Sequence, residues 1–183
     1  DATLDTDFFI NYGAEMLIEI MRFWASIVTF DEKEGRYHID GVMGPDEFHE
    51  KYPEPRFGLS AGIRDNAYTN IMVVWLMQKT IQLLEDLPKE QIASLFSKLG
   101  IDKTILNDFE SISKKLRVVI DAKGIIAQFD GYFDLADLDW EAYRKKYGNI
   151  HRLDRILKAE GDSPDKYKVA KQADMLMTYY LLS

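Results

Sequence analysis

A stretch rich in glycine and proline, residues 38–70, limits the folds that this chain can adopt. It interrupts both the helical and the alternating apolar period, so we predict a long loop between two helical segments. Asp46, Glu47, His49 and Glu50 fall close together within it. Loops held by a rigid scaffold commonly carry binding and catalytic groups. The residues that break the periodicity are Gly41, Gly44, Pro45, Pro53, Pro55, Gly58 and Gly62.

The segment before the loop has apolar residues every three to four positions, which predicts an amphipathic helix. We expect this helix to cover Asp5–Thr29, with Thr6 or Asp7 as its N-cap. Arg36–Val42 then alternates apolar and polar residues. This alternation predicts a short strand or β-hairpin at the entrance to the loop.

The segment after the loop predicts a second long helix, capped by Asp65 or Asn66 and ending near Leu87. Its apolar residues cover most of the circumference, so we expect it to be mostly buried. The segments that follow are shorter and more charged. They predict helices over Pro88–Leu99, Lys103–Leu116, Trp140–Tyr147 and His151–Ala159.

The last helix is predicted to start with Ser163 as N-cap and Pro164 as its first residue, and to run to the end of the chain. Lys171, Gln172 and Asp174 interrupt its apolar run. Charged groups in a buried helix are costly unless they are paired. These residues therefore either face a pocket together or lie on the one solvated face, and their spacing leaves both interpretations open.

The class is mainly α, because the sequence has no βαβ alternation and no internal repeat, and we expect residues 1–183 to form a single domain. The net charge of −8 disfavours nucleic acid and anionic lipid as partners. The absence of cysteine excludes disulfides and thiolate sites. No apolar run approaches the ~20 residues that a membrane span needs.

Glu47 has the chemistry of a general acid. Pro45 and Phe48 give it a stiff, apolar setting, which disfavours the charged form of a carboxyl group. A protonated carboxyl can give its proton to a leaving oxygen. The competing interpretation is a solvated acidic turn, which is common in loops.

Three nearby side chains, His38, Asp46 and His49, are of metal-ligating types. A metal site needs ligands that converge in space, and the spacing of these residues shows only that they are close in sequence. We therefore predict no metal site.

Several motifs together resemble glycoside hydrolase family 65, the family of maltose, trehalose, kojibiose and nigerose phosphorylases. They are HIDGVMGPDEFHEKYP followed by DNAYTN, and then IAQFDGYFDL, RLD and KYKVAKQADMLMTYYLL in the family's order. The resemblance implies part, about half, of an (α/α)6 barrel of paired helices. It also implies an inverting reaction in which inorganic phosphate cleaves an α-glucosidic disaccharide to give a β-sugar 1-phosphate.

The same resemblance assigns roles to residues of this chain. Glu47 becomes the general acid, and Lys171 and Gln172 bind the donor sugar. The resemblance implies no cofactor, and inorganic phosphate is a co-substrate. Because phosphate is already an anionic nucleophile, the second carboxylate that an inverting hydrolase uses is unnecessary. The residues that border the substrate pocket are His49, Glu50, Tyr68 and Asn70.

The resemblance further implies that the chain is an internal fragment of a cytoplasmic enzyme. The family's Trp-Asp donor segment and its phosphate loop are expected outside residues 1–183, so we expect the isolated chain to be catalytically silent. The apolar faces around Phe23, Trp75 and Leu176 are then expected to be covered by the rest of the barrel or by a second copy in a homodimer.

Two other functions remain open from the sequence. One is a non-catalytic helical module for carbohydrate binding or protein interaction, whose apolar stripes would be covered within the chain. The other is an inverting hydrolase that uses water. It would need a carboxylate base about 6.5–9.5 Å from Glu47.

Overall fold

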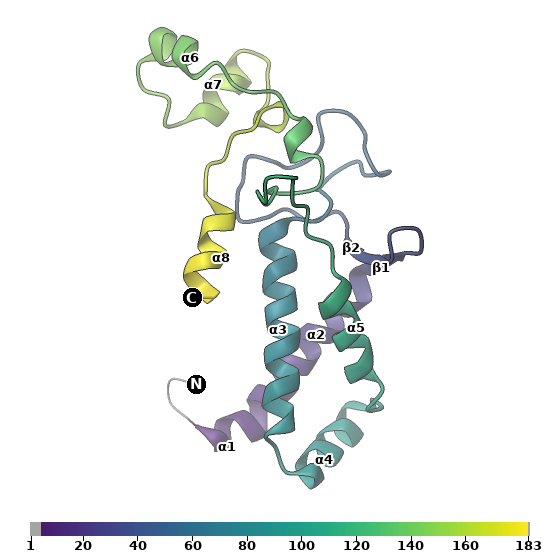
Figure 1. Cartoon of the computed structure of the whole chain (residues 1–183). Coiled ribbons are helices and arrows are strands. Elements are labelled where there is room, and N and C mark those ends of the chain that lie inside the picture. Colours follow the sequence, from purple (N-terminus) through teal and green to yellow (C-terminus); the bar gives the residue numbers. More distant parts are fainter. Residues whose placement is uncertain (1–4, 183) are drawn as a thin grey trace. The chain divides into compact units, whose positions relative to one another are not determined.

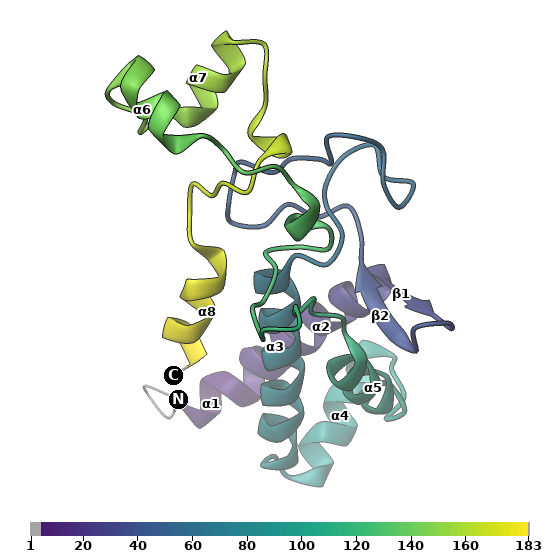
Figure 2. The same cartoon turned by 45° about the horizontal axis from the view of Figure 1, so that its top comes forward.

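The computed structural model describes residues 5–182 and divides into two compact units. The first unit comprises residues 1–38 and 70–117, and the second comprises residues 39–69 and 118–183. Helices dominate, and a two-stranded antiparallel sheet precedes the long loop (Figures 1 and 2). The predicted class is therefore confirmed. Within residues 5–182, no helix combines the length and apolar character needed to cross a membrane.

The first unit opens with a helix that contains a π-helical turn. Its N-cap is Asp5, whose carboxylate accepts the Phe8 N–H at 2.8 Å. The predicted caps, Thr6 and Asp7, are wrong because both residues already lie inside the helix. The successive segments are α1 (Thr6–Phe8), the π-helical turn (Phe9–Gly13) and α2 (Ala14–Ile27).

The hairpin shortens the first predicted helix. The helix ends at Ile27 because Val28–Asp31 forms strand β1, which pairs with strand β2, Arg36–Ile39. The turn between the strands is closed by the Gly35 N–H, which donates to the Asp31 carbonyl at 2.8 Å.

Helix α3 (Ala67–Glu85) follows the loop. Asn66 is its N-cap, as predicted, and its side-chain oxygen accepts the Thr69 N–H at 2.9 Å. Positions 70, 73, 77, 80 and 84 are buried, which makes one stripe along the helix. The opposite face includes Trp75, which is 43% exposed, so the expected burial does not extend around the whole helix.

The first unit ends with two amphipathic helices, α4 (Lys89–Leu99) and α5 (Ile105–Lys115). Gly100 terminates α4 with φ of 63°, a left-handed conformation that glycine adopts without a Cβ penalty. Helix α5 packs against α2 and buries Phe109 and Ile112.

The second unit is mostly irregular (Figure 1). Residues 118–131 contain a local bridge between Ile120 and Ile126 but no strand. Their backbone also pairs with the end of the long loop, because the Asp130 N–H donates to the Arg64 carbonyl at 3.0 Å and the Gln128 carbonyl accepts the Ala67 N–H at 2.9 Å. Glu160 accepts hydrogen bonds from Tyr143 and Tyr147 and so ties the end of α7 to α6. The helices of this unit are α6 (Trp140–Tyr147), α7 (Leu153–Ala159) and α8 (Asp174–Leu182), with short 3-10 turns at Tyr132–Asp134 and Pro164–Lys166.

The last helix starts ten residues later than Pro164, so its predicted start is wrong. Ser163 does act as a cap, but only for the short 3-10 turn. The chain is then extended, because its backbone N–H groups donate to other segments. The Lys168 N–H donates to the Ala136 carbonyl at 2.8 Å. The Lys171 N–H donates to the Asp46 carboxylate, also at 2.8 Å. Lys171 and Gln172 therefore lie in a loop.

Two apolar clusters hold the second unit together. The first joins Phe48 to α7 and to Val169, and Phe48 belongs to the loop of residues 40–65, which we call the acidic loop. The second surrounds Phe129. Both include loop residues, so the loop 40–65 is packed. The buried members are Phe48, Leu138, Leu153, Leu157 and Val169 in one cluster, and Tyr52, Ile63, Phe129 and Leu135 in the other.

Candidate active site

The acidic loop is folded back on itself. Val42 and Ile63 exchange backbone hydrogen bonds of 3.3 and 2.8 Å, and the Gly62 N–H donates to the Glu50 carbonyl at 2.7 Å. Asp65 closes the base of the loop, because its carboxylate accepts the Ile39 N–H at 3.1 Å. The segment from Asp46 to Glu50 is thereby held within a fixed frame.

Asp46 is the centre of a buried hydrogen-bond network. Its carboxylate accepts from Gln128 Nε2 at 2.7 Å and contacts His49 Nδ1 at 3.2 Å. It also accepts the backbone N–H groups of Lys171 at 2.8 Å and Gln172 at 3.4 Å. The Asp46 side chain thus joins the acidic loop to Gln128 and to the backbone of Lys171 and Gln172.

The charge of Asp46 is stabilised despite its burial. Burial by itself would raise the pKa of Asp46, but the hydrogen bonds from His49, Gln128 and the Lys171 N–H outweigh it and hold the pKa below its usual value. Sequence reasoning named Asp46 only as a metal candidate. The available signal was its position directly before the candidate acid Glu47.

His49 is buried and makes two polar contacts within the chain. Its Nδ1 faces Asp46, and its Nε2 lies 3.0 Å from the Tyr167 carbonyl oxygen. Its ring also packs against Phe129, with centroids 5.0 Å apart. The structure therefore places His49 in the network beneath the loop, where it orients Asp46. The sequence had placed it at the pocket border.

Asp174 completes the network from the start of α8. Its Oδ2 accepts the Asp46 N–H at 3.0 Å, and its burial raises the pKa of Asp174. Gly44 lies against this carboxylate. A Cβ at position 44 would lie 2.8 Å from Asp174 Oδ2 and 2.3 Å from Asn66 Nδ2. Glycine is therefore required there by close approach.

Glu47 points away from this network. Its carboxylate forms an ion pair with Lys171 Nζ, and 60% of its side chain is exposed. The expected apolar enclosure of Glu47 is therefore wrong for this chain, because Phe48 turns into the core cluster. The structure does bring together two residues that the sequence assigned to one site, Glu47 and Lys171.

A cavity of about 730 Å³ opens beside Glu47. Its volume is within the range of small-molecule sites. The acidic loop, α7 and the 3-10 turn at Pro164 each contribute to its wall. The residues that line it are Met43, Glu47, Phe48, Glu50, Asp154, Arg155, Lys158, Asp162, Ser163, Pro164 and Asp165.

The other predicted site residues are divided between the two units. Glu50 lines the large cavity, and Gln172 lines a smaller cavity of about 200 Å³ together with Gln128 and Asp174. Tyr68 is half-buried in the second unit. Asn70 belongs to the first unit, where its amide donates to the Arg117 carbonyl at 2.6 Å.

Asp165 is a further residue that sequence reasoning missed. Its carboxylate accepts the Glu50 N–H at 3.0 Å and the Ser163 hydroxyl at 2.8 Å. It therefore fixes the acidic loop to the far wall of the cavity. No local sequence pattern marks the contact with Glu50, because Glu50 and Asp165 are 115 residues apart.

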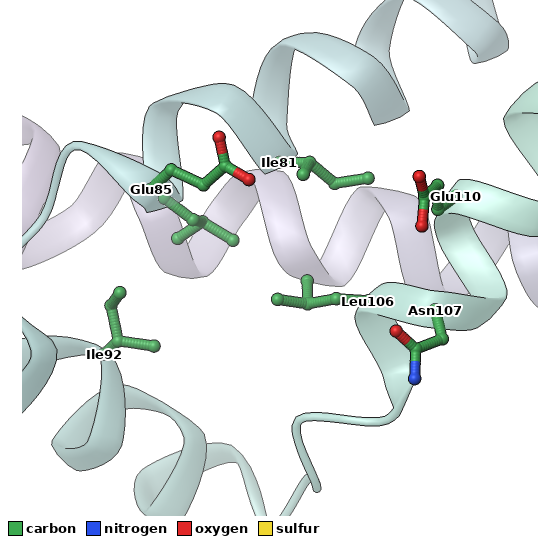
Figure 3. A pocket seen from close by; sticks show the side chains of 7 residues that line it. Ile81, Glu85, Ile92, Leu106, Asn107 and Glu110 are labelled. Atoms are coloured by element: carbon green, nitrogen blue, oxygen red, sulfur yellow. The ribbon is translucent and has the colours of Figure 1, made fainter.

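The first unit has a cavity of its own, of about 300 Å³, between α3, α4 and α5 (Figure 3). Its wall is largely aliphatic, with Ile81, Leu84, Ile92 and Leu106, and carries Glu85 and Glu110 at the sides. It contains none of the predicted site residues. We interpret it as a packing gap between helices.

Asp31, Glu34 and His38 form a cluster at the hairpin that the sequence analysis did not consider. Each offers one ligand atom within 4.8 Å of the others. Arg117 Nη1 lies 3.3 Å from Glu34 and already supplies a positive charge to this cluster. The other two metal candidates, Asp46 and His49, lie in the second unit, where Asp46 Oδ2 is 3.2 Å from His49 Nδ1.

The family model for the glycosyl hydrolase family 65 central catalytic domain matches residues 1–183. The chain belongs to this family. Over 98% of its length it is 45% identical to the trehalose 6-phosphate phosphorylase of Lactococcus lactis. Over a similar length it is 34% identical to the kojibiose phosphorylase of Halothermothrix orenii. It is also 46% identical over 99% of its length to an uncharacterized glycosyl hydrolase of Mycobacterium tuberculosis.

A solved family 65 structure, provisionally named a kojibiose phosphorylase and obtained from the human microbiome, matches 97% of the chain with a TM-score of 0.75 and 28% identity. It has an (α/α)6 barrel, so the predicted barrel class is confirmed. This chain covers 22% of that structure and between 13% and 22% of the three curated relatives. It is therefore part of a catalytic domain.

Proposed function

We propose that the whole protein is a cytoplasmic glycoside phosphorylase that cleaves an α-linked disaccharide with inorganic phosphate. The observation that carries this proposal is the match of the entire chain to the family's catalytic domain. Two relatives that are named phosphorylases, each from a different organism, match 98% of the chain. The ion pair between Glu47 and Lys171, next to a cavity of suitable size, supports it from the chemistry.

The identities favour a phosphorylated disaccharide as the substrate. The chain is 45% identical to the trehalose 6-phosphate phosphorylase and 34% identical to a kojibiose phosphorylase over comparable lengths. We therefore propose an α-linked glucose disaccharide whose acceptor sugar carries a phosphate monoester. Acceptor denotes the sugar that leaves with the glycosidic oxygen.

In the proposed reaction, an oxygen of inorganic phosphate forms a bond to the anomeric carbon from one face. The bond from that carbon to the glycosidic oxygen breaks on the other face, and its electron pair stays on the leaving oxygen. Glu47 gives its carboxyl proton to that oxygen. A single displacement inverts the configuration, and the products are a β-sugar 1-phosphate and the acceptor sugar.

Lys171 is proposed to bind the donor sugar and to stabilise the Glu47 carboxylate once the proton has left. In the free chain the two side chains are paired, and an adjacent cation favours the charged form of a carboxylate. We propose that a hydroxyl of the donor sugar accepts a hydrogen bond from the Lys171 ammonium, next to Glu47. Gln172 and Glu50 are proposed to bind sugar hydroxyls beside it.

The test uses the full-length protein with inorganic phosphate and a panel of trehalose, trehalose 6-phosphate, kojibiose and maltose. Phosphorus and proton NMR would detect a β-sugar 1-phosphate. We expect Glu47→Gln to lower kcat by about 10²–10⁴-fold, the range for loss of a general acid. Glu54→Gln is the matched control, since Glu54 is exposed in the same loop and lines none of the cavities described above.

Three results would contradict the proposal. Free glucose formed without consumption of phosphate would indicate a hydrolase. Full activity of Glu47→Gln would remove Glu47 from the mechanism. Sugar binding without turnover of any compound in the panel would favour a binding module.

A further inference from the structure

Two cations of helix α7, Arg155 and Lys158, line the same cavity as Glu47. Together with Asp154 they occupy one face of the helix, since positions 154, 155 and 158 lie within about 100° of one another around its axis. Both cationic side chains are exposed. Among the described residues, neither is recorded in an ion pair or a side-chain hydrogen bond. They are therefore available to a ligand.

The orientation of α7 is fixed by its apolar face. Leu153 and Leu157 are buried in the cluster that contains Phe48, the residue that follows Glu47. The packing that sets the rotation of α7 also links the helix to the acidic loop. The cations thus have a defined position on the wall that Glu47 shares.

The carboxylates of this wall are largely satisfied by their own partners. Asp154 accepts both Nε and Nη2 of Arg152, at 3.1 and 2.7 Å. Asp162 accepts from Lys166 Nζ at 2.8 Å and from the Tyr167 hydroxyl at 2.7 Å.

The remaining carboxylates of the wall differ in their contacts. Asp165 accepts the Glu50 N–H and the Ser163 hydroxyl, and Glu47 is paired with Lys171. Glu50 itself is exposed and is suited to accept a hydrogen bond from a sugar hydroxyl. Arg155 and Lys158 therefore line a cavity whose carboxylates, apart from Glu50, already have hydrogen-bond or ion-pair partners.

We propose that Arg155 and Lys158 bind the phosphate group of a phosphorylated acceptor sugar and so select the substrate. The guanidinium of Arg155 can donate two parallel hydrogen bonds to phosphate oxygens, and the ammonium of Lys158 adds a point charge. A cavity of about 730 Å³ has room for a sugar phosphate beside Glu47. This inference rests on the proposed phosphorylase function.

The same chemistry would suit inorganic phosphate, so the two sources must be distinguished. In an inverting displacement, the nucleophile and the general acid act on opposite faces of the anomeric carbon. The general acid acts at the glycosidic oxygen of the leaving sugar, and Arg155 and Lys158 line the cavity that contains the proposed acid, Glu47. The geometry favours the phosphate monoester of the acceptor over the attacking phosphate.

The test compares the full-length protein with the double variant Arg155→Gln/Lys158→Gln. We expect the KM for trehalose 6-phosphate to rise about 10- to 100-fold, the loss for one or two charged hydrogen bonds. The KM for inorganic phosphate and the kcat are expected to stay within about 3-fold. The control Lys145→Gln removes an exposed cation of α6 that lies outside this cavity and should change none of these values.

A titration of glucose 6-phosphate by calorimetry separates this inference from the proposed function, because it needs no turnover. We expect binding to the wild-type protein, weaker binding of glucose, and loss of the preference in the double variant. Equal affinity of the wild type and the double variant for glucose 6-phosphate would overturn the inference. A selective rise in the KM for inorganic phosphate would also overturn it. Absence of any phosphorolysis would contradict the proposed function, while the titration would still decide the role of these cations.

Discussion

The two compact units of the chain are held by different interactions. In the first unit, the buried positions of α3 repeat every three to four residues, and α2 packs against α5 through apolar side chains. In the second unit, side-chain carboxylates bind backbone N–H groups of distant segments. The buried carboxylates in residues 5–182 are Asp46, Asp65, Asp165 and Asp174, and all of them belong to the second unit.

This difference explains where the candidate site lies. A carboxylate that binds several N–H groups can hold irregular segments in place, whereas helical packing needs regular segments. The second unit can thus present side chains from loops, where binding and catalytic groups commonly lie. The same contacts leave few local patterns in the sequence.

The largest effect is expected from Asp46→Asn. The amide would turn a donor towards the other donors of the network, so we expect the free energy of unfolding to fall by about 3–5 kcal/mol, as for a broken buried charge pair. The matched control in the first unit is Asp86→Asn, since Asp86 is exposed, with an expected change within about 0.5 kcal/mol. Urea unfolding measures both. Equal stability of the two variants would show that the network does not hold the second unit.

A pair of glycines gives the next largest contrast. We expect Gly44→Ala to cost about 3 kcal/mol, because its Cβ would press on Asn66 and Asp174 in a packed site. Gly100→Ala in the first unit meets no atom within 4 Å. It should cost only about 1 kcal/mol for its left-handed φ. A comparison of urea midpoints tests this order, and a larger loss for Gly100→Ala would contradict it.

The smallest effect concerns pH. Because the pKa of Asp46 is lowered, its contribution to stability is complete above the ordinary value of 3.8 and is lost as pH falls through the folded-state value. The raised pKa of Asp174 acts in the opposite sense. The folded protein holds that proton more tightly, so its ionisation destabilises the fold as pH rises above 3.8 towards the raised value.

Asp174→Asn isolates this second effect. We expect the substitution to raise the free energy of unfolding more at pH 7 than at pH 4. The difference between the two gains is expected to be on the order of 1 kcal/mol per unit of pKa shift. The carbonyl oxygen of asparagine can still accept the Asp46 N–H. Unfolding curves at both pH values check the prediction, and a gain at pH 4 that exceeds the gain at pH 7 would refute it.

The exposed apolar side chains sharpen one sequence-based expectation. Phe23, Trp75 and Leu176 are 56%, 43% and 68% exposed. The hypothesis of a self-standing module required these faces to be covered within the chain, and they are not. The chain also spans about a fifth of the phosphorylases that it resembles. Both observations fit a part of a larger barrel.

Regular elements with clear local signals could be predicted from the sequence. Trp140–Tyr147 has the predicted bounds, and Asn66 caps α3. The start of the last helix could not be predicted, because Ser163 and Pro164 form a real capping signal that ends after one short turn. Long-range hydrogen bonds to Lys168 and Lys171 keep the next residues extended.

The sequence by itself determined the family, the mainly helical class, the long acidic loop and the pairing of Glu47 with Lys171 as candidates for one site. Only the tertiary structure decided which of two adjacent carboxylates is buried. Asp46 turns inward because its partners come from Gln128 and Lys171, 82 and 125 residues away along the chain. Glu47 remains at the cavity. Two neighbouring acids have the same local sequence context, so the segments brought against each of them set their different burial and charge environment.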